Sequence, residues 1–196
     1  MTGIILAGGE SKRMGVDKAF MMVAGIPLVE HVLRALGPVV QQIIIVTNSP
    51  ERYRTYNVRV VADRLERRGP LMGIYSGICS SESEYNVVVA CDMPFLNARL
   101  LSYQMELAPG YDAVVPAFGK LIEPLHAVYS RNLLPVIEEL IREDERRIRS
   151  IFGRANVRYV TEKEIDCFDP ERRSFINLNT PQHYKEATCS DSECRN

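Results

Sequence analysis

Two uninterrupted apolar runs constrain the fold of this chain more than any other feature. Residues 43–47 read Ile-Ile-Ile-Val-Thr, and residues 86–91 read Asn-Val-Val-Val-Ala-Cys. A strand with one solvent-exposed face alternates apolar and polar residues, whereas a continuous apolar run indicates a strand buried on both faces. Both faces of a sheet are covered when helices connect parallel strands. The two runs therefore predict a parallel sheet between layers of helices.

Shorter segments around these runs continue the alternation of strands and helices. Further strands are expected over residues 3–7, 58–62, 112–116, 125–129 and 157–160. Helices are expected over residues 27–36, 71–79, 97–107 and 181–187, and in the stripe of Leu133, Ile137, Leu140 and Ile141. Strands that alternate with helices along a chain build parallel sheets with helices on both faces. The pattern predicts an α/β fold with a three-layer, doubly wound, mostly parallel sheet.

Length, composition and charge limit the class of protein. The chain has 196 residues, of which 46% are hydrophobic and 25% charged, and we expect a single domain over residues 1–188. Residues 189–196, which include Cys189 and Cys194, are expected to be a disordered tail. The five scattered cysteines indicate reduced thiols and a cytoplasmic protein. A net charge of -1 and the lack of a long apolar run argue against a nucleic-acid partner and a membrane span.

A glycine-rich loop follows the first expected strand. The residues of interest there are Leu6, Ala7, Gly8, Gly9, Arg13, Gly15 and Lys18. Glycines directly after a strand allow backbone N–H groups to approach a phosphate chain, and Arg13 and Lys18 can neutralise its charge. The alternative is a tight turn with two solvated cations. The loop is neither a Walker loop nor a GxGxxG turn, because the Gly-Lys-Ser/Thr and the third spaced glycine are missing.

An aspartate ends the second apolar run, in the sequence Cys91-Asp92-Met93-Pro94. In a doubly wound sheet, ligands bind beyond the carboxyl ends of the strands. A carboxylate there can hold Mg²⁺, which typically takes one or two protein carboxylates and completes its shell with substrate phosphates and water. We therefore expect Asp92 to be a metal ligand, with a turn or helix-capping aspartate as the alternative.

Further polar side chains follow other expected strands. Asn48 and Asp63 each come directly after a strand, so both are expected at the same edge, where they can hydrogen-bond a base or ribose. Asn177 and Asn179 are spaced so that both amides of an extended segment point to one side. Roles in turns or helix caps are the alternatives for these four residues.

One histidine falls within an expected strand. His126 follows Glu123 and Pro124, and the segment continues as an apolar run. A histidine on a strand is more often packed or hydrogen-bonded than catalytic. We therefore expect a structural role for His126.

The motifs have a fixed order along nearly the whole chain. They are Leu6-Ala7-Gly8-Gly9, Arg13-Met14-Gly15, Asp17-Lys18, Gly69-Pro70-Leu71, Cys91-Asp92-Met93-Pro94, Glu123-Pro124-Leu125-His126-Ala127-Val128-Tyr129 and Asn177-Leu178-Asn179-Thr180-Pro181. Together they resemble the molybdenum cofactor guanylyltransferase family of the NTP-transferase superfamily. Many NTP transferases share the glycine loop and the Asp-x-Pro, whereas the last two segments narrow the match. The resemblance implies the Rossmann-like fold of nucleotide-diphospho-sugar transferases.

The resemblance implies an Mg²⁺-dependent nucleotidyltransferase that moves GMP from GTP to the terminal phosphate of molybdopterin or Mo-molybdopterin. Such an enzyme releases pyrophosphate and forms molybdopterin guanine dinucleotide. The GTP contacts expected from the loop and the resemblance are Leu6, Ala7, Gly8, Gly9, Lys18, Asn48, Asp63 and Asp92. Lys18, Arg13 and Asp92 are the expected catalytic groups, with Mg²⁺ on Asp92. Asn177 and Asn179 are placed near the pterin, and transient contact with proteins that deliver or accept the cofactor is expected.

Three other functions stay open. A related NTP transferase can use CTP or another phosphorylated acceptor, such as a sugar phosphate or cobinamide phosphate. Related cytidylyltransferases read Leu-Ala-Ala-Gly where this chain reads Leu-Ala-Gly-Gly, which favours guanine. A nucleotide-binding regulatory protein would bind GTP without releasing pyrophosphate. A Rossmann oxidoreductase would bind NAD(P), which the missing GxGxxG argues against.

Overall fold

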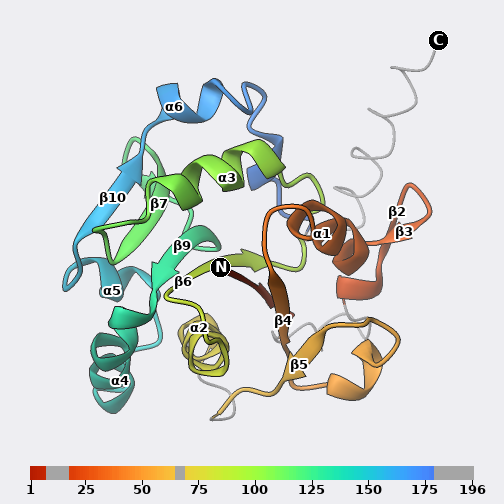
Figure 1. Ribbon diagram of the computed structural model, residues 1–196, viewed down its shortest axis with the longest axis horizontal. Helices are drawn as coiled ribbons and strands as arrows, with labels where there is room; N and C mark the ends of the chain where they lie inside the picture. The colour runs from red at the N-terminus through yellow and green to blue at the C-terminus, as the bar shows by residue number, and fades with distance from the viewer. Residues whose placement is uncertain (8–17, 65–68, 179–196) are drawn as a thin grey trace.

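The computed structural model describes residues 1–7, 18–64 and 69–178, which form a layered α/β structure (Figure 1). Its main sheet has 8 strands: β1 (Thr2–Leu6), β4 (Gln42–Val46), β5 (Arg59–Val61), β6 (Tyr85–Ala90), β7 (Ala113–Phe118), β8 (Leu121–Ile122), β9 (His126–Ser130) and β10 (Val157–Val160). The strands lie in the order β10-β7-β9-β6-β1-β4-β5, and β8 pairs with β7. Among the described residues, no helix combines the length and the apolar character needed to cross a membrane.

Helices cover both faces of the sheet (Figure 1). They are α1 (Leu28–Leu36), α2 (Gly69–Ser80), α3 (Ala98–Glu106), α4 (Leu134–Arg142), α5 (Arg149–Phe152) and α6 (Glu162–Asp166). One core lies on the side of α1, α3 and α6 and includes Ile5, Val32 and Leu100. The other lies on the side of α2, α4 and α5 and includes Ile4 and Leu71. Neighbouring residues of β1 belong to opposite cores, which is why this strand is apolar without alternation.

The directions of the strands bring the carboxyl ends of the parallel strands to one edge. β1 pairs in parallel with β4 and β6, β4 pairs in parallel with β5, and β7 pairs in parallel with β10. β9 is antiparallel to its neighbours β6 and β7. The carboxyl ends of the parallel strands therefore meet at one edge, together with the amino end of β9. The predicted α/β fold with a mostly parallel sheet is confirmed.

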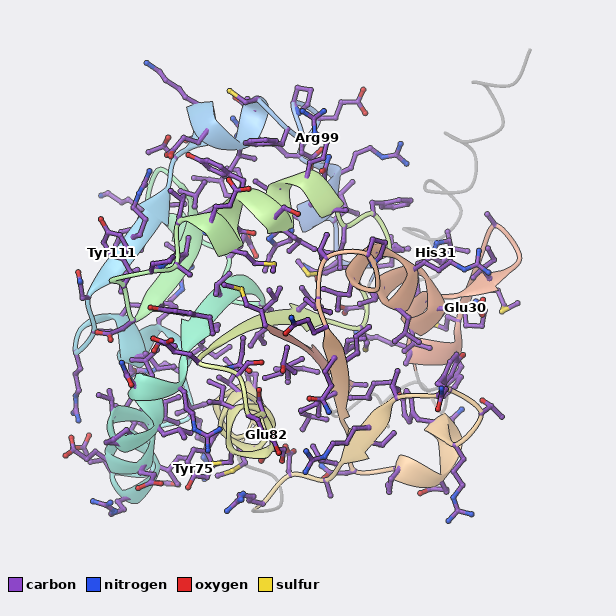
Figure 2. The ribbon with its side chains drawn as sticks, in the orientation of Figure 1. Glu30, His31, Tyr75, Glu82, Arg99 and Tyr111 are labelled. Atoms are coloured by element: carbon purple, nitrogen blue, oxygen red, sulfur yellow. The ribbon has the colours of Figure 1, made fainter. Side chains whose placement is uncertain are left out.

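The sequence prediction missed a small hairpin before α1, formed by β2 (Met22–Val23) and β3 (Ile26–Pro27). Two-residue strands are too short to show a period. Pro27, which was expected in the first turn of the helix, is instead the extended residue before α1, with a ψ angle of 144°. His31 of α1 holds the hairpin, because its Nε2 donates a hydrogen bond of 2.9 Å to the Val23 carbonyl (Figure 2).

Other differences concern the ends of elements and the short helices. Asn97, expected inside a helix, is the cap of α3, and its Oδ1 accepts hydrogen bonds from the backbone N–H groups of Arg99 and Leu100 at 2.9 and 3.2 Å. The helices α5 and α6 were not predicted, because each buries a single residue and shows no periodic stripe. The helix expected over residues 181–187 lies outside the described residues.

Two glycines allow α2 to pack closely on the sheet. A Cβ atom on Gly77 would lie 2.5 Å from Cγ2 of Ile4, and one on Gly73 would lie 3.2 Å from Cδ2 of Leu6. Real Cβ atoms essentially never approach a neighbour as closely as the first distance. Close-packed interiors cannot absorb an added methyl group without movement. The spacing of these glycines therefore determines how near α2 lies to β1 and β4.

A histidine is buried on the α3 side of the sheet. His126 begins β9 and is fully buried, with its ring centroid 4.7 Å from that of Phe175. Neither ring nitrogen has a hydrogen-bond partner within the part of the chain that the structure describes. Burial lowers the pKa of His126 to about 4, although the negative charge of Asp169 acts in the opposite direction. The imidazole is therefore neutral at ordinary pH, as suits the packed role expected for it.

We expect Gly77→Ala to destabilise the protein by roughly 1–3 kcal/mol, because the new methyl group pushes α2 away from β1. The gain of about 1 kcal/mol in helix propensity offsets only part of this packing cost, because a contact of 2.5 Å cannot be relieved without moving the helix. Gly153→Ala is the matched control, since a Cβ atom there lies 3.9 Å from the Ser150 carbonyl, an ordinary contact. Urea unfolding measures both free energies, and equal stability of the two variants would contradict the prediction.

His126 is expected to make the free energy of unfolding fall as the solution is acidified. Its pKa is lowered from 6.5 to about 4 in the folded state, so between these values the unfolded chain binds the proton more readily. Between about pH 7 and pH 5 this group alone costs roughly 2 kcal/mol. His126→Leu should show a smaller loss over that interval in urea unfolding. The same pH dependence in both proteins would assign the loss to other groups.

Candidate functional site

The sheet ladder continues past the ends of three strands. The backbone N–H of Ala7 donates to the Val46 carbonyl at 2.8 Å, and that of Cys91 donates to the Leu6 carbonyl at 3.1 Å. The N–H of Thr47 donates to the Val61 carbonyl at 2.9 Å. The segments that follow β1, β4 and β6 therefore leave the sheet side by side. This arrangement brings the residues expected to form the site to one edge.

Asn48 and Asp63 meet at the β4–β5 end of this edge. Nδ2 of Asn48 donates a hydrogen bond of 3.2 Å to Oδ2 of Asp63, while Oδ1 of Asp63 is buried without a partner among the described residues. Burial raises the pKa of Asp63, and the hydrogen bond from Asn48 lowers it in part. The two side chains predicted to share a site are thus in direct contact. One acceptor oxygen of Asp63 therefore has no donor among the residues that the structure describes.

A small pocket of about 20 Å³ lies beside Asp63. Its walls are Leu6, Val46, Asp63, Gly69, Pro70 and Gly73. The two glycines come from α2, and the absence of a side chain on Gly73 leaves room next to Leu6 and to Oδ1 of Asp63. The pocket therefore combines backbone, an apolar wall and a carboxylate, which are groups that suit a sugar or a base edge. In this structure, the volume is that of roughly one water molecule.

Asp92 lies near the middle of the edge, directly after β6. It is half-buried, and burial raises the pKa of its carboxyl group, while the positive charge of Lys18 lowers it. Lys18 opens a short 3₁₀ helix (Lys18–Phe20), so the structure brings these two predicted residues within electrostatic reach. Burial destabilises the charged form of the Asp92 carboxylate, and a nearby cation stabilises that charged form. Asp92 is therefore suited to bind one.

A metal ion at Asp92 would depend on ligands from the substrate. Across residues 1–7, 18–64 and 69–178, no three His, Cys, Asp or Glu side chains gather as a metal site. Mg²⁺ often uses one or two carboxylates of the protein and takes its other ligands from phosphates and water. The single half-buried carboxylate of Asp92 fits that donor set. It does not fit a closed structural metal site.

The end of the described chain returns to Asp92. The backbone N–H of Leu178 donates to the Asp92 carbonyl at 3.0 Å, which places Asn177 beside the aspartate. Nδ2 of Asn177 donates to the Phe175 carbonyl at 3.5 Å. The C-terminal segment and β6 are therefore joined at the site. Asn179, the other asparagine expected near the pterin, lies outside the described residues, as do Gly8, Gly9 and Arg13.

Hydrogen bonds from Asn97 hold the segment 167–178 against the start of α3, and further bonds stabilise the segment internally. The Asn97 side chain donates to the Phe168 carbonyl at 2.8 Å, and its backbone N–H donates to Oγ of Ser174 at 3.0 Å. Asp169, which is buried, accepts from the backbone N–H groups of Arg173 and Ser174 at 3.1 and 2.8 Å. The sequence did not predict these hydrogen bonds, because they involve single polar residues that show no periodic pattern. In the sequence, the signal for this contact was Asn97 itself, a residue type that often caps a helix.

Glu123 lies on the opposite side of Asp92 from Asp63. It occupies the turn between β8 and β9 and is half-buried. Burial raises the pKa of its carboxyl group, and the positive charge of Arg149 lowers it. The edge thus carries three carboxyl groups with raised pKa values, on both flanks and near the middle. Glu123 begins one of the motifs that carry the family resemblance, but it was not predicted to be a site residue, because a glutamate in a loop does not by itself indicate a ligand.

Comparisons with known proteins agree with this architecture. The family described as the MobA-like NTP transferase domain matches residues 3–159. A probable molybdenum cofactor guanylyltransferase of Pelotomaculum thermopropionicum is 37% identical over 186 residues, covering 95% of this chain and 91% of the relative. A molybdenum cofactor guanylyltransferase of Desulfosudis oleivorans is 37% identical over 189 residues, covering 95% of this chain and 94% of the relative.

A solved structure extends the likeness to the fold. The molybdopterin-guanine dinucleotide biosynthesis protein A of Archaeoglobus fulgidus superposes with a TM-score of 0.83 at 30% identity, over 98% of this chain and 100% of that chain. The family match spans β1 to β10, and therefore includes Asp63, Asp92 and Glu123. The resemblance that the motifs indicated is confirmed. The chain belongs to the MobA-like NTP transferase family.

Proposed function

We propose that this chain is a molybdenum cofactor guanylyltransferase. It transfers GMP from GTP to the terminal phosphate of molybdopterin, or of its molybdenum form, and releases pyrophosphate. The observation that carries this proposal is the likeness, over nearly the full length, to relatives with that activity in their names. The order of site residues along the sheet edge supports it, because nucleotide, metal and acceptor can lie side by side there.

The nucleotide is proposed to lie over the ends of β1, β4 and β5. Leu6 and Ala7, with Gly8 and Gly9, bring backbone to the triphosphate. Asn48 and Asp63 offer hydrogen-bonding groups to the base and ribose, and the unpartnered Oδ1 of Asp63 supports this assignment. Buried acceptors without donors are costly, so a ligand N–H or O–H that reaches this atom contributes to binding.

Asp92 is proposed to hold Mg²⁺ together with phosphate oxygens of GTP. When bound, the ion would supply positive charge that offsets charge on the phosphates. Lys18, and by the same proposal Arg13, would add further positive charge toward the phosphates. The influence of Lys18 on the pKa of Asp92 supports its position near the phosphates. This set suits a substrate that carries several negative charges.

The reaction is an in-line displacement at the α-phosphorus of GTP. An oxygen of the acceptor's terminal phosphate forms a bond to that phosphorus. The bond from the α-phosphorus to the oxygen bridging to the β-phosphate breaks, and pyrophosphate leaves with the electron pair. No nucleophilic side chain is needed, so the protein acts by positioning and electrostatics.

The acceptor is proposed to lie on the β9 side of Asp92, with Asn177 and Asn179 near the pterin. The hydrogen bond from Leu178 to the Asp92 carbonyl supports this side. Contacts with proteins that deliver or accept the cofactor are part of the proposal. So is a cytoplasmic location, which the unbridged cysteines Cys79 and Cys167 support.

Residues 1–188 are proposed to act as one domain. The family match ends at residue 159, but the segment beyond it is tied to the loop after β6 by Asn97 and by the bond between Leu178 and Asp92. These contacts support a site that both parts complete.

The first test is the release of pyrophosphate from GTP and from CTP, each with Mg²⁺ and molybdopterin. We expect release with GTP and little with CTP. Release with CTP in place of GTP would keep the mechanism and overturn the choice of base. Tight GTP binding without release would contradict transfer to this acceptor and favour a nucleotide-binding regulatory role.

Asp92→Asn and Lys18→Ala are expected to lower kcat for pyrophosphate release by roughly 100-fold or more each, the size of other losses of a single charge-stabilising group. Glu82→Gln is the matched control, since this exposed glutamate precedes β6 at the opposite edge of the sheet (Figure 2). Steady-state kinetics at several Mg²⁺ concentrations check the prediction. A wild-type kcat for Asp92→Asn would remove the metal assignment.

A further inference from the structure

The turn that carries Glu123 runs beside the end of β6. The backbone N–H of Glu123 donates to the Pro116 carbonyl at 3.0 Å, and its carbonyl accepts from the N–H of His126 at 3.2 Å. The N–H of Ala90 donates to the Leu125 carbonyl at 3.2 Å. Because neighbouring strands lie about 4.8 Å apart, this turn is within one or two strand spacings of the backbone of Asp92. Glu123 and Asp92 therefore flank the end of the β6–β9 pair.

The carboxylate of Glu123 is half-buried, and no donor reaches it from the part of the chain that the structure describes. The described residues give its oxygens no hydrogen bond, although the positive charge of Arg149 is close enough to influence it. Burial without donors disfavours the charged form, which agrees with the raised pKa of this group. A phosphate here would meet a like charge. The ligand that suits this carboxylate carries N–H donors.

Apolar side chains lie at the same edge. Phe118 of β7 packs against Phe175 with ring centroids 4.9 Å apart, and Leu121 of β8 pairs with Phe118 across the β7–β8 hairpin. Leu121 is 63% exposed and Ile176, next to Phe175, is 41% exposed. Apolar side chains at the same sheet edge as a carboxylate suit a planar heterocycle, whose faces are apolar and whose edge carries N–H groups. They suit a sugar less well.

We propose that the carboxylate of Glu123 binds the pterin end of the acceptor. It accepts one hydrogen bond from the exocyclic amino group of the pterin and a second from the adjacent ring N–H. Two parallel N–H donors match the two oxygens of a carboxylate, a pairing that is strong and geometrically selective. This inference rests on the proposed function, which supplies pterin as the acceptor and leaves the β9 side of Asp92 for it.

Glu123 then acts as a specificity residue with a defined orientation. The negative charge of Glu123 repels the acceptor's phosphate and attracts its amino-substituted ring edge. The phosphate is left to approach Asp92 and the cations there. This side chain thereby favours the orientation of the acceptor that the reaction needs, in which the phosphate points toward the nucleotide.

The test compares two fluorescent probes, pterin and lumazine, by titration against the full-length protein. Lumazine has a carbonyl oxygen where pterin has its exocyclic amino group, so it faces a carboxylate with an acceptor. We expect wild-type protein to bind pterin roughly 10- to 100-fold more tightly, the usual range for hydrogen bonds to a charged group. Glu123→Gln should reduce this preference to less than about threefold, because an amide offers one donor and one acceptor.

Glu82→Gln is the control and should keep the wild-type preference, since its carboxylate lies at the far edge of the sheet. Thermal unfolding and GTP binding check that Glu123→Gln is folded, and Glu123→Ala replaces it if it is not. Full preference for pterin in the Glu123 variant, or none in wild-type protein, overturns the inference. The titration involves no transfer, so loss of pyrophosphate release with an intact, Glu123-dependent preference would contradict the proposed function alone.

Discussion

The burial of β1 between β4 and β6 is the constraint on which the rest of the structure depends. All five residues of β1 are buried, and the strand hydrogen-bonds to a parallel neighbour on each side. Its backbone pairing continues to Ala7 and Cys91, so the chain cannot leave the sheet before the residues of the site begin. The close packing of α2 through Gly77 covers one face of the same strand. The site is therefore positioned by a fully buried strand.

Much of the fold could be predicted from the sequence, because continuous apolar runs report burial on both faces directly. The strands at residues 43–47 and 86–91 and the convergence of Asn48, Asp63 and Asp92 followed from that rule and from the geometry of parallel sheets. The direction of β9 did not follow, since an apolar strand reads the same in either direction. The hairpin before α1 and the contacts that attach residues 167–178 to Asn97 and Asp92 were also missed. Their positions depend on single contacts between distant residues, which no periodicity records.

The carboxyl groups of the site carry a cost in the folded protein. Burial raises the pKa values of Asp63, Asp92 and Glu123, which means that each charge is less stable than it is in the unfolded chain. A ligand that brings cations or N–H donors removes part of this penalty and therefore stabilises the folded state as it binds. His126 adds no such cost at neutral pH, because its buried imidazole is uncharged there, and its cost appears only on acidification. The site is held in place by the hydrophobic cores around it rather than by its own polar groups.

The hydrogen bond between Leu178 and the Asp92 carbonyl has a consequence for the order in which the protein is made. Synthesis proceeds from the N-terminus, and the strands β1, β4, β5 and β6 leave the ribosome well before residue 178. The strands that carry Asn48, Asp63 and Asp92 at their ends are thus synthesised before the segment that returns to Asp92. Contacts between residues far apart in sequence also form late in folding, since the closure of a long loop must precede them. The segment that pairs with Asp92 is therefore the last part of the described edge to be synthesised.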